Sequence, residues 1–282
     1  MLSSSFYVVL GFAASAVVLG WAYFRRYEIT RPPVGVFGLG DVAFMMGAIV
    51  VLPYLYLYFP LWLVGGIFSV GMLSILYFTA EPLFLGVRWA LWLVVLVVWG
   101  ADIWTQLQFG ALSTPFLVVN NAVLVIAIAG TTNLWVQSGM KARDATVLAG
   151  MLVVYDLIAT SLLPLTTDLI ARLAGMPFTP LVAWGADGGR LAIGLGDLLL
   201  ATTFPLVMRK AFGRSAGIAA MIIGLGTIAA MMAFLLLAKV EVALPVMTAL
   251  GPLMVLQYVY WVRKRGAERT TWQYLQAEPL DR

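Results

Sequence analysis

Two aspartates lie inside long apolar segments of this 282-residue chain, in Tyr155-Asp156 and in Gly194-Leu195-Gly196-Asp197. An ionisable residue at bilayer depth is costly, so each one is a candidate functional residue. Two facing carboxyl groups in a poorly hydrated site share a proton and titrate as a coupled pair. One can then take a proton from water as the water attacks a peptide carbonyl, while the other donates to the developing oxyanion. This is the chemistry of an aspartyl protease.

The composition places these aspartates in a membrane. Hydrophobic residues make up 62% of the chain and charged residues only 11%, which is more apolar than a soluble domain. Runs of about 18 or more apolar residues can cross about 30 Å of hydrocarbon. We count nine such runs, near residues 6–24, 41–59, 61–79, 88–107, 114–131, 145–163, 191–208, 215–238 and 242–262.

The fold class predicted is therefore an all-α polytopic membrane protein with about nine transmembrane helices in a single membrane domain, 1–282. Residues 1–140 are expected to form a five-span scaffold, 141–262 the catalytic spans six to nine, and 263–282 a cytoplasmic tail. Pro60 is the only clear break between the second and third spans. If these two are one bent element, the count is eight.

Loop charge predicts the orientation, because cytoplasmic loops are enriched in Lys and Arg. With nine spans, fourteen of the 17 basic residues fall on one side, which puts the N-terminus outside and the C-terminus in the cytoplasm. The fourteen are Arg25, Arg26, Arg31, Arg88, Lys141, Arg143, Arg209, Lys210, Arg214, Arg263, Lys264, Arg265, Arg269 and Arg282, and the other side has Arg172, Arg190 and Lys239. Short loops favour a prokaryotic plasma membrane.

The absence of two residue types excludes several kinds of catalytic and metal site. The chain has no Cys and no His, which excludes disulfides, thiolate or imidazole metal sites, and Cys or Ser-His nucleophiles. The net charge of +4 comes from residues at span ends and forms no continuous nucleic-acid surface. We therefore expect no metal, no organic cofactor and no nucleic acid. The expected partners are the lipid bilayer and transmembrane peptide substrates, and the oligomeric state stays open.

The two aspartates are predicted to lie at the same depth. Asp156 comes twelve residues after Asp144, and Asp197 comes twelve residues before Arg209, which is about 18 Å of helix in each case. Consecutive antiparallel spans commonly pack side by side, so the carboxyl groups are expected to face each other. Gly194 and Gly196 remove side chains beside Asp197 and permit close backbone approach.

A third motif, Ala243-Leu244-Pro245, opens the last apolar run. The three motifs fall in order on the sixth, seventh and ninth spans, and this combination resembles the presenilin and signal peptide peptidase family of intramembrane aspartyl proteases, of GxGD type. The likeness covers about 145–262. It implies that Asp156 and Asp197 are the catalytic pair. The residues implied to support the site or bind substrate are Tyr155, Gly194, Leu195, Gly196, Ala243, Leu244 and Pro245.

This chain departs from the family pattern at Val242, where the family usually has a proline. The departure affects the third motif and leaves the aspartate pair intact. The orientation derived from loop charge matches what the resemblance implies for signal peptide peptidases and is opposite to that of presenilins. The implied activity is therefore hydrolysis of peptide bonds within transmembrane segments or remnant signal peptides.

The long exported connection contains an extended-prone segment, Phe178–Trp184, followed by a glycine-rich turn. It can offer a strand edge to an unwound substrate, as the resemblance implies. The alternative is a loop on the membrane surface with Trp184 as an interfacial anchor.

Other polar residues in the spans have structural interpretations. Asp41, in a second Gly-Leu-Gly-Asp sequence, is expected to cap the second span, and Asp102 is expected to be hydrated near the exported boundary. Asn120 and Asn121 are expected to form interhelical hydrogen bonds.

Two other functions stay open. A prepilin-type membrane aspartyl peptidase also uses a GxGD aspartate, but Leu198 follows Asp197 where a lysine is expected, and the other motifs stay unexplained. A proton-coupled transporter could use paired aspartates as a relay, but the chain lacks the internal repeat that transporters usually have.

Overall fold

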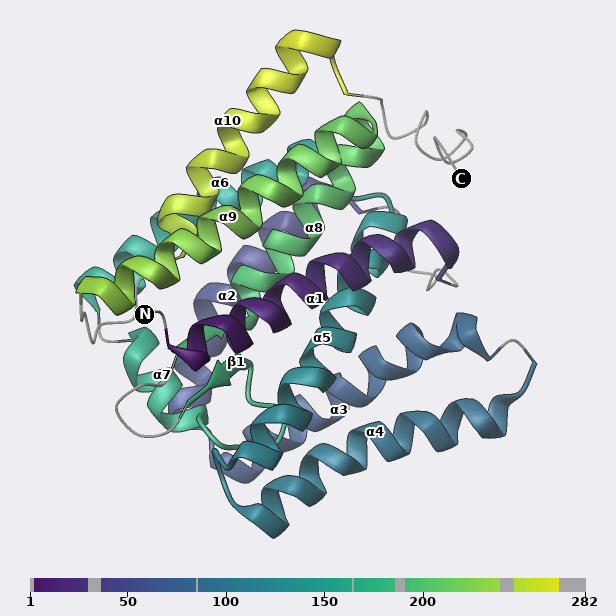
Figure 1. Ribbon diagram of the computed structural model, residues 1–282, viewed down its shortest axis with the longest axis vertical. Coiled ribbons are helices and arrows are strands. Elements are labelled where there is room, and N and C mark those ends of the chain that lie inside the picture. The colour runs from purple at the N-terminus through teal and green to yellow at the C-terminus, as the bar shows by residue number, and fades with distance from the viewer. Residues whose placement is uncertain are drawn as a thin grey trace.

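The computed structural model describes residues 3–29, 37–84, 86–163, 165–185, 191–238 and 246–268. Within these ranges the regular secondary structure is helical apart from one two-stranded antiparallel sheet (Figure 1). The elements in chain order are α1 (Ser4–Arg26), α2 (Leu39–Tyr58), α3 (Leu61–Ala80), the 3-10 turn η1 (Glu81–Leu83), α4 (Arg88–Phe109), α5 (Thr114–Gln137), α6 (Ala142–Asp156), the π-helix η2 (Leu157–Leu162), α7 (Leu165–Leu173), β1 (Leu181–Trp184), β2 (Leu191–Gly194), α8 (Leu195–Phe212), α9 (Arg214–Ala238) and α10 (Met247–Arg265).

Within the described residues, six helices are long and apolar enough to cross a membrane: α1, α2, α3 with η1, α4, α5 and α9. This supports a multi-pass membrane protein. The other three predicted spans fall on α6, α8 and α10, which are less uniform. The α-helical part of α6 ends after 15 residues, α8 carries Asp197, Arg209 and Lys210, and α10 ends in three basic residues. The count of nine spans therefore stays a prediction.

The second and third predicted spans are separate helices. The chain leaves the helical conformation at Phe59 and Pro60, both of which have extended backbone. The two helices then take different neighbours, because α2 packs on α6 and α7 whereas α3 packs on α4 and α5. The alternative of one bent element is wrong.

Helix α5 is the central helix of the bundle. The apolar window of α5 is 61% buried inside the protein, against 11% for that of α2. In Figure 1, α3 and α4 lie on one side of α5, and α8 separates it from α9 and α10 on the other. It packs on α1, α3, α4, α8 and β1. Because α5 also contacts the sheet, it links the scaffold helices to the segment that precedes Asp197.

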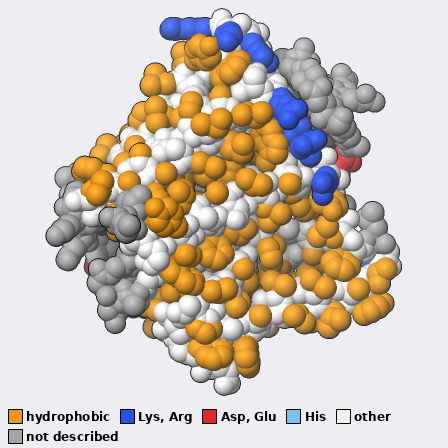
Figure 2. All heavy atoms as spheres, in the orientation of Figure 1, with side chains coloured by type: hydrophobic (Ala, Val, Ile, Leu, Met, Phe, Trp, Pro, Cys, Tyr) orange, Lys and Arg blue, Asp and Glu red, His pale blue; other side chains and the backbone are white. Residues whose placement is uncertain are grey.

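Basic side chains gather at one end of the molecule. In Figure 2 the visible Lys and Arg side chains follow one edge, near the C-terminal ends of α1 and α10, while hydrophobic side chains cover most of this face. Two basic side chains bind carbonyls at helix ends. Lys210 Nζ donates to the Val136 carbonyl at 2.7 Å, and Arg265 donates to the Phe212 carbonyl. This separation of charge is the pattern from which the sequence predicted a cytoplasmic side.

Candidate active site

Asp156 is the last residue of α6, where the helix widens into the π-helix η2. Such π-type insertions occur frequently at functional sites. The Asp156 side chain is half-buried, and its Oδ2 accepts a hydrogen bond from the backbone N–H of Met247 at 3.3 Å. Met247 is the first residue of α10, so the start of α10 contacts the carboxyl group at the end of α6.

Asp197 is the third residue of α8 and is also half-buried. Gly194, which ends β2 and caps α8, has no Cβ; a Cβ there would lie 3.2 Å from Asp197 Oδ2. The carboxyl group therefore turns back toward the backbone that leads into the helix, and Gly194 leaves space for it. A Cβ on Gly196 would meet nothing within 4 Å, so the described residues also leave space at this position beside Asp197.

The fold brings the two aspartates into one region. Helix α6 packs on α8, and the carboxyl groups of Asp156 and Asp197 interact electrostatically. Each carboxyl group lies at a helix N-terminus, that of α10 for Asp156 and that of α8 for Asp197. Free backbone N–H groups and the positive end of the helix dipole are found at such termini. Each of the two carboxyl groups therefore lies beside the positive end of a helix.

The other predicted site residues divide into two sets. Tyr155 and Leu195 are half-buried and pack against the hydrophobic core next to the two aspartates. Ala243, Leu244 and Pro245, as well as Val242, lie outside the described residues. The described chain resumes at Val246, and Met247, two residues after Pro245, contacts Asp156.

The predicted extended segment forms half of a hairpin that leads into α8. β1 pairs with β2 in antiparallel register, with Val182 opposite Ile193 and Ala183 opposite Ala192. The sheet extends by one bond from Leu195 N–H to the Pro180 carbonyl at 2.9 Å. Trp184 packs partly buried against the hydrophobic clusters, so it is not simply an interfacial anchor.

The outer edge of β1 is bonded to α5. Asn121 donates to the Ala183 carbonyl at 2.8 Å and accepts from the Ala183 N–H at 3.1 Å. Asn120 donates to the carbonyls of Thr179 and Leu181 at 3.3 and 3.4 Å. The prediction that these asparagines bond between helices is wrong, because their partners are strand and loop backbone.

The outer edge of β2 faces away from these contacts. In an antiparallel pair, the residues of one strand point their N–H and C=O groups alternately toward the partner and away from it. Since Ala183 directs its groups toward α5, its partner Ala192 must direct its own groups to the opposite side of the hairpin. Ala192 is exposed and lies five residues before Asp197. Among the described residues, no strand pairs with this outer edge of β2, which runs up to the aspartate.

Asp102 anchors the turn that precedes β1. Its side chain is 0% exposed, and its Oδ2 accepts from the Phe178 N–H at 2.7 Å. The Trp99 ring stacks on the Phe178 ring, and Gln106 donates to the Gly175 carbonyl at 3.4 Å. The prediction of a hydrated Asp102 is wrong, because this turn covers the carboxyl group.

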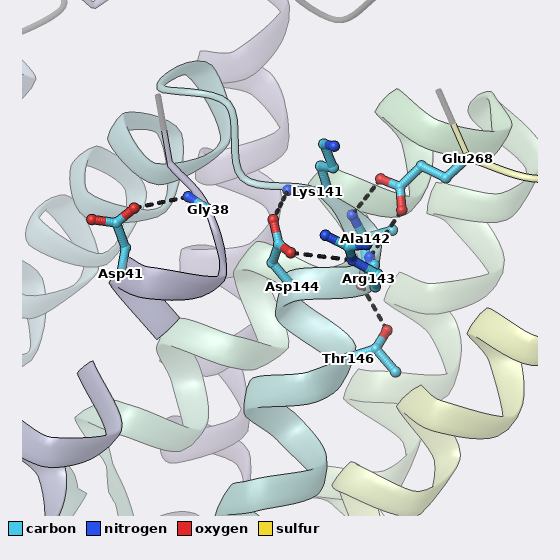
Figure 3. Close-up of polar contacts among 8 residues, drawn as sticks. All are labelled: Gly38, Asp41, Lys141, Ala142, Arg143, Asp144, Thr146 and Glu268. Carbon is cyan, nitrogen blue, oxygen red and sulfur yellow. Dashed lines mark hydrogen bonds and ion pairs between the residues drawn. The ribbon is translucent and has the colours of Figure 1, made fainter. Parts of the chain in front are cut away.

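Acidic residues cap the N-termini of α2 and α6 (Figure 3). Asp41 accepts from the Gly38 N–H at 2.8 Å at the start of α2, as predicted. Glu268 accepts from the Ala142 and Arg143 N–H groups at 2.7 and 3.0 Å, and so joins the segment after α10 to the start of α6. Sequence reasoning missed Glu268, since no local pattern connects it to a helix more than a hundred residues earlier.

Among the described residues, no cluster of three or more Asp, Glu, His or Cys side chains is arranged to hold a metal ion. Comparison of the chain with family models and with curated proteins found no match.

Proposed function

We propose that this chain is an intramembrane aspartyl endopeptidase in which Asp156 and Asp197 act on water and a peptide bond. The observation that carries the proposal is the arrangement of these two interacting carboxyl groups at two helix N-termini, beside the open edge of β2. Two interacting carboxyl groups at bilayer depth are costly in free energy unless they have a function. The motif resemblance to presenilins and signal peptide peptidases supports the same assignment.

In the proposed reaction, one carboxyl group is ionised and the other protonated. The ionised group takes a proton from water as the water oxygen bonds to the scissile carbonyl carbon, and the protonated group donates to the carbonyl oxygen. A tetrahedral diol results. The C–N bond then breaks as the nitrogen accepts a proton from the carboxyl group that took it from water, and one diol hydroxyl returns a proton to the other carboxylate. A carboxylic acid and an amine result, and the aspartate pair again holds a single proton. The hydrogen bond from Met247 fixes the rotation of the Asp156 carboxyl group in these steps.

The proposed substrate is a transmembrane segment or a remnant signal peptide. Its helix must unwind before water can reach a peptide carbonyl, and the unwound backbone then needs hydrogen-bond partners at membrane depth. The outward N–H and C=O groups of Ala192 can supply them by strand addition. The nine-span topology, with the N-terminus outside, belongs to this proposal, as does the location in a prokaryotic plasma membrane.

The test is cleavage of a synthetic transmembrane peptide by the purified full chain in lipid vesicles, with products identified by mass spectrometry. Wild type is expected to cut the peptide and Asp156→Ala is not. A peptide isostere with a hydroxyl group at the scissile position should inhibit, because it mimics the tetrahedral intermediate. A chelator should have no effect. Chelator-sensitive cleavage that added zinc restores would contradict the mechanism, and proton flux without cleavage would favour a transporter.

A further inference from the structure

Asn121 is a fully buried amide on α5, with 0% of its side chain exposed. It forms two hydrogen bonds with the same residue, one donated to the Ala183 carbonyl at 2.8 Å and one accepted from the Ala183 N–H at 3.1 Å. A neighbouring antiparallel strand would form this same pair of bonds with Ala183. The Asn121 side chain therefore occupies the place of a third strand at the outer edge of β1.

This contact leaves the hairpin with one usable edge. At β1, the outward groups of Leu181 and Ala183 face Asn120 and Asn121. At β2, the outward groups of Ala192 have no hydrogen bond to any described residue, and Ala192 is exposed. A peptide strand can therefore add to β2 and not to β1.

The geometry points to Asn121 as a positioning residue that fixes the hairpin and so sets which peptide bond of a substrate strand reaches Asp197. This inference rests on the proposed protease function. The path from Asn121 to Asp197 is short and runs through the hydrogen-bonded backbone of the hairpin. Asn121 fixes Ala183, the register sets Ala192 opposite Ala183, and the chain runs from Ala192 through Gly194 directly into α8. A slip of one residue in strand pairing turns every side chain to the other face. A loosened hairpin can pair with the substrate in more than one register, so the protein should cut the substrate at several positions.

The same helix offers a matched control. Asn133 is also 0% exposed on α5, and its Nδ2 donates to the carbonyls of Gly20 and Ala129 at 3.0 and 2.8 Å. Its Oδ1 accepts from the Gln137 side chain at 3.3 Å, so its partners are helix backbone and one helix side chain, and none of them belongs to the hairpin. Asn121→Leu and Asn133→Leu therefore remove the same buried group from one helix, and only the first releases Ala183.

The experiment uses the full chain in lipid vesicles and a synthetic peptide with one transmembrane segment of about 20 apolar residues. Two quantities are measured for wild type and both variants: product masses, and amide hydrogen exchange over residues 181–184. Asn121→Leu should exchange about tenfold faster there, because Ala183 loses its partners, and should yield products cut at neighbouring bonds. Asn133→Leu should keep the exchange rate at 181–184 and the wild-type cleavage site, even if its total rate falls.

The outcomes separate the two proposals. Faster exchange in Asn121→Leu with cleavage still confined to the wild-type bond would overturn the positioning role. Unchanged exchange at 181–184 would overturn the anchoring itself. If wild type forms no product that Asp156→Ala lacks, the protease function fails and the positioning role fails with it, while the exchange measurement still decides whether Asn121 anchors the hairpin.

Discussion

The backbone N–H of Met247 lies 3.3 Å from Oδ2 of Asp156, so the start of α10 and the end of α6 meet at this carboxyl group. One turn further along α10, Gly251 makes the approach possible. A Cβ on Gly251 would lie 2.3 Å from Val153 Cγ2 and 3.0 Å from the Ala149 carbonyl oxygen. The close packing of α10 on α6 therefore supports the contact with Asp156.

Replacing Gly251 should damage both packing and activity. Gly251→Ala is expected to lower the free energy of unfolding by about 1–3 kcal/mol, the usual effect of overpacking, and to reduce cleavage as Met247 moves away from Asp156. Gly226→Ala on α9 is the control, because a Cβ there meets nothing within 4 Å. Thermal unfolding in detergent and peptide cleavage are the measurements. Equal stability of the two variants would contradict the tight contact.

The two proposed catalytic aspartates should be separable from Asp41. Asp156→Asn and Asp197→Asn should each lower the cleavage rate by about 10²-fold or more, since each removes a group that transfers protons. Asp41→Asn should keep most of the activity, because Asp41 only caps the exposed start of α2. Product formation is measured by mass spectrometry. Near-wild-type activity in Asp156→Asn would exclude the dyad, and loss of activity in Asp41→Asn would favour the prepilin-type alternative.

Asp102 should act through its hydrogen bond and not through its charge. Asp102→Ala leaves the buried Phe178 N–H without a partner, and an unsatisfied buried group costs about 1–3 kcal/mol. Asp102→Asn keeps an acceptor oxygen for this N–H and should be more stable than Asp102→Ala. Unfolding midpoints of the two variants test the prediction. An asparagine variant as unstable as the alanine variant would show that the carboxyl group has another role.

The orientation can be tested directly because the chain has no cysteine. Ser4 and Ala267 are exposed residues near the two ends of the described chain. In intact cells, Ser4→Cys should react with a membrane-impermeant maleimide and Ala267→Cys should stay protected, since the charge split puts the first outside and the second in the cytoplasm. Permeabilised cells should label both. Labelling of Ala267→Cys in intact cells would reverse the predicted topology.

The sequence predicted the helical segments well because apolar length and flanking charge are local signals. The break at Pro60 and the cap at Asp41 were also readable locally. Asp102 and Asn121 were misinterpreted for one common reason. Their partners, Phe178 and Ala183, lie 76 and 62 residues away, in a segment whose position depends on the whole bundle. Periodicity alone does not show whether such a polar residue is buried, because its burial depends on partners that are distant in the chain.

The partners of the α5 amides also bear on membrane insertion. Asn133 donates to the carbonyl of Gly20, which is synthesised before it. The partner of Asn121 is Ala183, which is synthesised 62 residues later. Placing an amide side chain in hydrocarbon without a hydrogen-bond partner costs several kcal/mol. We therefore expect newly made chains to keep α5 beside the insertion machinery until the hairpin has been synthesised. Ribosome-stalled chains that end before residue 183 should crosslink from α5 to that machinery, and chains that extend past α8 should not. Equal crosslinking at both lengths would show that α5 enters lipid unassisted.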